Sequence, residues 1–407
     1  MDVAIIIKRY LRFSFFNLLL VAFIGIILRY KILFSLPFID QKFLLHGHSH
    51  FAFAGWISQT LMVLMVAYLS KETNENKFLP YKKILVSNLL TAYGMLIAFP
   101  IQGYGLYSIT FSTFSVFVSY FFSIKFWKDL NNLKVSSAVH YWFKAALLFA
   151  VFSSLGTFAL AYMMAHKMAH LNWYLAAVYF YLHFQYNGWF FFTCAGFLYS
   201  LFPSTVIQDK KLKIIFWLFT GSCIPAYLLS TLWMSLPFWL YIIVVIASVA
   251  QVVAWCVLIK MLIQHKKDIF NQMSAAGRWT LFFSAMALTV KLSLQVGSTI
   301  PALGQWAFGF RSIVVAYLHL VLLGVISLFI VGFIFSQKYI HVNKLSKTGL
   351  VFFISGVFLN EFVLLLQGVA SISYNIVPLS NELLLLMALI MFAGIFQLFI
   401  SQMKTEK

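Results

Sequence analysis

Twelve long apolar stretches dominate this sequence and limit its fold more than any other feature. Each holds about 20 residues, the length that an α-helix needs to cross the hydrocarbon core of a bilayer. The chain is 62% hydrophobic and 10% charged, far more apolar than a soluble domain requires. We therefore predict an all-α polytopic membrane protein with a single transmembrane domain over residues 1–407. The predicted spans are 13–35, 43–69, 84–104, 106–127, 139–165, 171–202, 213–233, 236–262, 277–303, 308–336, 348–373 and 381–402.

The basic residues predict the orientation of these spans. With a cytoplasmic N-terminus, 22 of the 29 Lys and Arg residues fall in cytoplasmic segments. The opposite side then holds Arg29, Lys31, Lys42, Lys167 and Arg311. This asymmetry follows the positive-inside rule and places both termini in the cytoplasm. It also explains the net charge of +19 without a nucleic-acid partner, so the expected partner is the lipid bilayer.

A histidine motif recurs three times at nearly equal spacing. It consists of His with Gly five residues later, and in the first two copies Phe follows the His and Trp follows the Gly. The copies occupy residues 50–56, 183–189 and 319–324, so their histidines are 133 and 136 residues apart. Such spacing indicates an internal repeat. We predict three repeats, roughly 1–135, 136–270 and 271–407, forming a pseudo-threefold arrangement of three four-helix arcs.

The repeat places His50, His183 and His319 at similar depth on spans 2, 6 and 10, which run in the same direction. An imidazole in hydrocarbon must satisfy two nitrogens, and a metal on one with a hydrogen bond on the other does so. The alternative is that each histidine hydrogen-bonds a neighbouring helix. Gly55 and Gly324 leave a bare patch one turn deeper, where a flat group or a neighbouring helix can approach closely.

Two further histidines precede His50 on the same predicted helix. His46 and His50 are about 40° apart and share a face, whereas His48 points roughly the other way. His166 and His170 are another such pair, but they lie in the predicted outer loop before span 6, where solvated histidines are expected.

These features resemble the catalytic subunit of the haem-copper oxidases and nitric oxide reductases. The resemblance rests on twelve spans in three arcs, histidines on spans 2, 6 and 10, and His46-Gly47, which is similar to the His-Gly that starts the family's second span. The run from Arg311 through His319 to Gly324 is also similar to the smaller nitric-oxide-response haem-copper membrane proteins. As architecture the resemblance covers the whole chain, and as motif about 40 residues.

The resemblance implies one low-spin b-type haem held axially by a histidine from span 2 and one from span 10. The second is His319. The first is His50 by the internal repeat or His46 by the His-Gly match, and we prefer His50. Arg311 would pair with a haem propionate. Gly55 and Gly324 would let the flat macrocycle approach.

The resemblance also implies a second metal, copper or non-haem iron, with His183 as the span-6 ligand. His50, His319 and His48 complete the set of candidate metal-binding histidines. The chain departs from the family here, because span 10 carries Tyr317 where the family has the high-spin haem ligand. Residues 214–233 contain no histidine, whereas the family's span 7 carries a His-His pair. A complete binuclear centre therefore cannot be assembled from these helices.

We expect a bacterial cytoplasmic (inner) membrane haem protein in respiratory electron transfer, or in binding or reduction of nitric oxide or dioxygen. An electron donor or small respiratory subunits would be its partners. One alternative is a secondary transporter or metal-ion or proton translocator that uses the histidines and Glu361, the one acidic residue deep in a span; Lys291, in mid-span, could also carry protons. Another alternative is a cofactor-free assembly or structural subunit.

Overall fold

The chain is helical throughout the part that the computed structural model describes, which comprises residues 3–133, 138–168, 170–203, 206, 210–234, 236–304 and 310–403. Eleven helices in these ranges are long and apolar enough to cross a membrane. The prediction of an all-α polytopic membrane protein is thereby confirmed. The predicted repeat boundary at 135/136, and the basic residues Lys134, Lys404 and Lys407, lie outside the described ranges.

Every predicted span coincides with a helix or a continuous helical path. The path Leu171–Tyr199 is not among the eleven membrane-spanning candidates. Its middle carries His183, Gln185 and Asn187, which lower its mean apolarity.

The chain forms two compact units. Unit 1 comprises Met1–Leu133, Ser274–Phe283 and Ser327–Lys407, and unit 2 comprises Lys134–Met273 and Ser284–Ile326. The third predicted repeat contributes to both units. The single transmembrane domain and its threefold internal repeat stay predictions.

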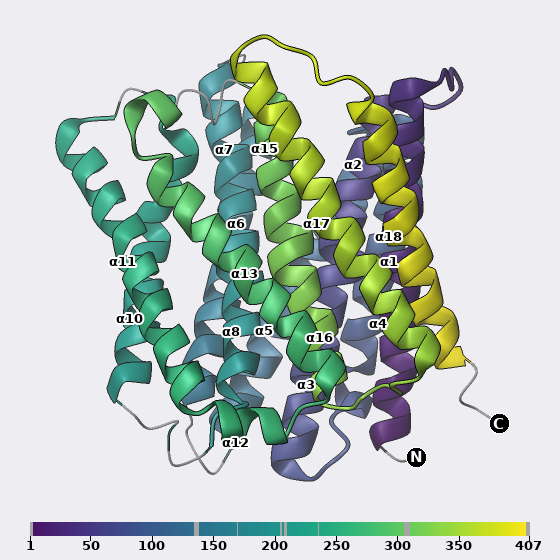
Figure 1. Cartoon of the computed structure of the whole chain (residues 1–407), viewed down its shortest axis with the longest axis vertical. Helices are drawn as coiled ribbons and strands as arrows, with labels where there is room; N and C mark the ends of the chain where they lie inside the picture. Colours follow the sequence, from purple (N-terminus) through teal and green to yellow (C-terminus); the bar gives the residue numbers. More distant parts are fainter. Residues whose placement is uncertain are drawn as a thin grey trace. The chain divides into compact units, whose positions relative to one another are not determined.

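Unit 1 is built from the first four helical paths and the last two. They are α1 (Val3–Leu33), α2 (Gln41–Phe51) with η1 (Ala52–Ser58) and α3 (Gln59–Thr73), α4 (Phe78–Gln102), α5 (Leu106–Asn131), α17 (Lys344–Ile372) and α18 (Ser380–Met403), together with α16 (Leu328–Ser336) and the first part of α13 (Ala275–Gly297). Helices α1 and α18 pack side by side, and Figure 1 shows the start of α1 and the end of α18 at the same end of this unit.

Unit 2 is built from the middle of the chain. It contains α6 (Ala138–Ala165), α7 (Leu171–His183) with η2 (Phe184–Phe190) and α8 (Phe191–Tyr199), α10 (Lys210–Ala226) with η3 (Tyr227–Thr231), α11 (Phe238–Gln264), α12 (Lys266–Asn271), the rest of α13, α15 (Arg311–His319) and most of η4 (Leu320–Ser327). Helix α10 ends directly after Pro225, whose ring cannot continue the helical hydrogen bonding, and the chain continues as the short 3₁₀ helix η3.

The histidine-bearing paths are more buried than the helices around them. Every residue of α3 from Gln59 to Ser70 is buried, and so is every residue of α16. By contrast, α5 buries only five of its 26 residues. Its exposed side chains are mostly Phe, Ile, Tyr and Leu, which suit lipid. Apolarity predicts both kinds of helix alike and does not distinguish the buried paths from the exposed ones.

Candidate functional site

His46 and His50 point to the same side of α2, as predicted, and contact the same two aromatic rings. The His50 ring stacks on Phe99 of α4 with centroids 4.3 Å apart, and the His46 ring meets Tyr104 edge-on at 4.7 Å. The Tyr104 hydroxyl lies 3.4 Å from Nε2 of His50. Nε2 of His46 is buried and has no hydrogen-bond partner among the described residues. The pair therefore offers two imidazole nitrogens in an aromatic setting.

Two glycines bring this aromatic wall against α2. A Cβ on Gly47 would lie 3.0 Å from the ring of Pro100, so glycine lets α2 and α4 approach closely next to His46. Gly103, which follows α4, has φ +58°, and a Cβ there would lie 2.5 Å from the Phe43 ring. Only glycine suits that position, and the turn it makes places Tyr104 over both histidines.

His48 faces α1, on the opposite side of α2, again as predicted. A Cβ on Gly25 of α1 would meet Cε1 of His48 at 3.6 Å, an ordinary packing distance. Nδ1 of His48 is buried, and no hydrogen-bond partner for it exists within the described ranges. In this arrangement His48 cannot share a ligand with His46 and His50.

A π-helical segment follows each of the three repeat histidines. Segment η1 begins two residues after His50, whereas η2 and η4 begin one residue after His183 and His319. The glycine of each motif copy lies inside its segment. Short π-helical segments are rare and are frequently found at functional sites. The sequence repeat is thus accompanied by a repeat in backbone conformation, which the sequence analysis did not anticipate.

Polar side chains from neighbouring helices satisfy the carbonyls of η1. Asn17 of α1 donates from Nδ2 to the Gly55 carbonyl at 2.6 Å and accepts from the Tyr93 hydroxyl at 2.6 Å. Asn88 of α4 donates to the Ala54 carbonyl at 3.0 Å. A π-helical turn disturbs the i→i−4 bonding of the helix, so its carbonyls need partners of this kind. A single amide in the apolar run of α1 was the available signal for Asn17.

Equivalent contacts occur in unit 2. The Cys223 thiol of α10 donates a hydrogen bond to the Asn187 carbonyl at 3.8 Å. Asn187 occupies the motif position that Ala54 occupies in η1. In η4 the Val325 carbonyl accepts from Ser284 of α13 at 2.7 Å. Thr193 donates to the Trp189 carbonyl at 2.7 Å, as Thr60 does to Trp56 at 2.6 Å. Each π segment is therefore held by a neighbouring helix as well as by its own.

Both ring nitrogens of His183 bind protein groups. Nε2 lies 2.9 Å from the Cys223 carbonyl, and Nδ1 lies 3.1 Å from the Asn187 amide nitrogen. Because a carbonyl only accepts, the proton is on Nε2, and Nδ1 accepts from the amide. The ring is only 2% exposed. To ligate a metal, His183 would have to give up one of these bonds.

His319 has the opposite tautomer. Its Nδ1 lies 3.0 Å from the Val315 carbonyl one turn earlier on α15, so the proton is on Nδ1 and the lone pair on Nε2. The ring is partly exposed, unlike that of His183. The motif makes the two histidines equivalent in sequence, and their surroundings distinguish them.

The glycines of the motif contact side chains. A Cβ on Gly324 would lie 3.1 Å from the Cβ of Ala287 on α13, and one on Gly55 would overlap the Phe51 ring. The sequence left open whether a flat group or a neighbouring helix approaches these glycines. At Gly324 a neighbouring helix, α13, approaches. Arg311 is exposed at the first position of α15, two turns before His319.

Other polar groups within the apolar helices have partners of their own. Glu361 of α17 accepts from the Asn360 amide at 3.1 Å and interacts electrostatically with Arg29 of α1. Lys291 of α13 is 5% exposed, and its charge interacts with Cys223. One turn on, Gln295 donates to Gln251 of α11 at 3.1 Å. His166 and His170, in the connection between α6 and α7, are exposed.

The described residues contain no group of three or more His, Cys, Asp or Glu side chains arranged to hold a metal ion. His50 belongs to unit 1, whereas His183 and His319 belong to unit 2. A comparison with protein-family models found no match to this chain, and a search of curated proteins found none either.

Proposed function

We propose that this chain is a membrane haem protein built like the catalytic subunit of the haem-copper oxidases. Its twelve helical paths would form three pseudo-symmetric arcs of four spans in a bacterial cytoplasmic membrane, with both termini inside. One low-spin b-type haem would be held by His319 and a histidine of α2. The role would be respiratory electron transfer or the binding or reduction of nitric oxide or dioxygen.

The tautomer of His319 is the observation that carries this proposal. A ligating histidine almost always donates its other ring N–H to a carbonyl, carboxylate or water, which fixes the ring and raises the basicity of the ligating nitrogen. The Val315 carbonyl supplies this acceptor for Nδ1 of His319. Nε2 of His319 then carries the lone pair that an iron would need.

The His46–His50 pair supports the second ligand. The buried Nε2 of His46 lacks a hydrogen-bond partner within the described residues, and a bound group would relieve that cost. His50 stays our preferred ligand, because it starts the motif that His319 shares. Phe99 would then hold the His50 ring by stacking, and the Tyr104 hydroxyl would shift its contact from Nε2 of His50 to another acceptor.

The remaining site residues fit supporting roles. Haem supplies an iron that cycles between two oxidation states and, when a coordination position opens, binds a diatomic gas. Arg311 provides an exposed guanidinium for a propionate. His183, with both nitrogens bonded, fits the packing of η2 against α10 better than ligation of copper or non-haem iron. This favours electron transfer or gas binding over reduction of dioxygen at a binuclear centre.

Absorbance spectra of the purified protein, oxidised and reduced, with haem stoichiometry per chain, test the proposal. We expect one haem b with a low-spin spectrum, loss of most haem in His319→Ala and His50→Ala, and a milder loss in His46→Ala. His166→Ala, in the exposed outer loop, is the matched control and should retain the haem. A wild-type protein without haem, or a His319→Ala variant with an unchanged Soret band, would contradict the assignment.

A second candidate function is proton or ion translocation, which the Glu361–Arg29 interaction and buried Lys291 favour. Charged groups inside a membrane are costly and often mark ion paths. Proteoliposomes that carry an imposed pH gradient separate the two functions. Transport that Glu361→Gln abolishes in a haem-free protein would support translocation, whereas a haem-loaded protein without transport would support the first proposal. Absence of both would leave the structural or assembly role.

A further inference from the structure

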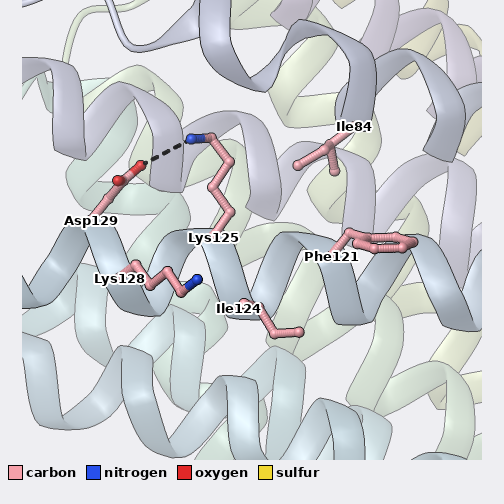
Figure 2. A pocket seen from close by; sticks show the side chains of 6 residues that line it. All are labelled: Ile84, Phe121, Ile124, Lys125, Lys128 and Asp129. Carbon is pink, nitrogen blue, oxygen red and sulfur yellow. Dashed lines mark ion pairs between the residues drawn. The ribbon is translucent and has the colours of Figure 1, made fainter.

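A surface groove of about 410 Å³ lies between α4 and α5 of unit 1. Its lining consists of Ile84 from α4 and of Phe121, Ile124, Lys125, Lys128 and Asp129 from α5. Figure 2 shows that the charged side chains gather at one end and that Ile84 and Phe121 lie at the other. The groove is therefore amphipathic along its length.

At the charged end, one acidic and one basic side chain already compensate each other. Lys125 lies 3.7 Å from Asp129, drawn as a dashed line in Figure 2, and its ammonium group sits 4.8 Å from the centre of the Tyr81 ring. The Tyr81 hydroxyl donates to the same carboxylate at 2.7 Å. Both contacts are to Oδ2, and the charge of Lys125 compensates the single negative charge of Asp129.

Of the two lysines that line the groove, Lys128 has no counter-charge among the described residues. It is exposed and forms no ion pair with any residue in the described ranges. Lys82 and Lys83, exposed near the start of α4, add positive charge to the same end of these helices. An anion near Lys128 would therefore meet a positive potential and one fully compensated carboxylate.

The side chains at the apolar end of the groove are exposed on the surface of α5. Phe121 is 65% exposed and Ile124 is 56% exposed. Phe121 precedes Asp129 by eight residues, or about 12 Å along the helix, so the apolar end extends toward the membrane interior. The 26 residues of α5 are long enough to cross the hydrocarbon core, which places the lysines near its end at the level of lipid headgroups.

We propose that this groove binds an anionic phospholipid, with its phosphate at Lys128 and an acyl chain along Ile84, Ile124 and Phe121. An inorganic phosphate would use the charged end alone and leave the apolar end unfilled. A lipid uses both, since juxtamembrane lysines attract anionic headgroups and apolar grooves take hydrocarbon. This site is independent of the haem proposal, because no residue of the His46–His50 pair contributes to it.

Native mass spectrometry of the whole protein, purified and titrated with phosphatidylglycerol or with phosphatidylcholine of the same chains, tests the proposal. We expect tighter retention of phosphatidylglycerol. Lys128→Gln should weaken it about fivefold, since one lysine near an anionic headgroup contributes about 1 kcal/mol, and 1.4 kcal/mol is a tenfold change. Lys71→Gln, an exposed lysine at the end of α3 outside the groove, is the matched control and should change little.

A second variant examines the apolar end. Phe121→Ala should weaken the retention of both lipids, because it shortens the wall for the acyl chain. Inorganic phosphate at equal concentration should not displace the bound lipid. Equal retention of the two lipids, equal effects of Lys128→Gln and Lys71→Gln, or displacement by phosphate alone would each overturn the proposal.

Discussion

The copies of the histidine motif at residues 50–56 in unit 1 and 183–189 in unit 2 share a sequence pattern and a backbone conformation but differ in what their histidines contact. Residues 50–56 and 183–189 both continue as π-helical segments whose carbonyls are satisfied from a neighbouring helix. His183 binds protein groups with both ring nitrogens. By contrast, Nε2 of His50 lies 3.4 Å from the Tyr104 hydroxyl, and the His50 ring stacks on Phe99. The motif thus encodes the backbone, and the neighbouring helices decide the role of each histidine.

Removal of the histidine ring should distinguish the two regions most strongly. In cofactor-free protein, His183→Leu leaves the Asn187 amide and the Cys223 carbonyl without their partner in a buried place. We expect a loss of about 2–4 kcal/mol of unfolding free energy, because each unsatisfied buried group costs about 1–3 kcal/mol. His50→Leu should cost less than about 1 kcal/mol, because its one polar contact is long.

Unfolding of the purified proteins in mixed detergent micelles with increasing denaturing detergent measures this difference. His183→Asn keeps one donor and should recover part of the loss, which separates the hydrogen bonds from the volume of the ring. Equal losses for His183→Leu and His50→Leu would show that the two histidines are held alike.

Removing a side chain that supports a π segment should also lower the unfolding free energy by different amounts in the two units, but the difference should be smaller than that between His183→Leu and His50→Leu. Asn17→Leu removes the donor to the Gly55 carbonyl and the acceptor of the Tyr93 hydroxyl, so we expect a loss of about 2–3 kcal/mol. The side-chain contact between α6 and η2 should contribute less to stability. Ser153 of α6 accepts from the Gln185 side chain at 2.8 Å but does not bind a backbone carbonyl of the π segment. Ser153→Ala should therefore cost about 1 kcal/mol.

The same unfolding measurement compares them, with Tyr93→Phe as the control for the hydroxyl. That variant should lose less than Asn17→Leu, because the Gly55 carbonyl keeps its donor. If Asn17→Leu were as mild as Ser153→Ala, the amide would not be needed to hold η1.

Apolarity was sufficient to predict the helices, but it did not predict where a helix extends beyond its apolar stretch. The span predicted at 13–35 belongs to α1, which begins at Val3, because Lys8, Arg9 and Arg12 are compatible with a helix although they are not apolar. Likewise Leu171–Tyr199 is helical although its middle is polar. Helix propensity sets where a helix begins and ends, whereas apolarity marks only the part of it that suits the membrane interior.

The site was predictable where it depends on one helix and not where it depends on several. The shared face of His46 and His50 follows from helical geometry alone, and the structure confirms it. Segment η1 depends on Asn17 and Asn88, which lie 38 and 34 residues from the carbonyls they satisfy. Tyr104 reaches the histidines only through the turn at Gly103. Local sequence patterns carry no information on such distant partners.

The subtlest difference between the histidines is the position of one proton. In cofactor-free protein we expect His183 to be protonated on Nε2 and His319 on Nδ1, because each of these nitrogens faces a backbone carbonyl. Solid-state NMR of protein with ¹⁵N-labelled histidine rings distinguishes the two tautomers, and His183→Gln and His319→Gln assign the signals.

The same experiment connects the proton to the proposed function. Haem binding should leave the Nδ1 proton of His319 in place and change the signal of Nε2, because the Val315 carbonyl holds one nitrogen while the other binds iron. His183 should be unaffected, since neither of its nitrogens is available without breaking a hydrogen bond. If His183 and His319 shared one tautomer, or if haem changed the His183 signals first, the iron ligand would have to be sought at η2.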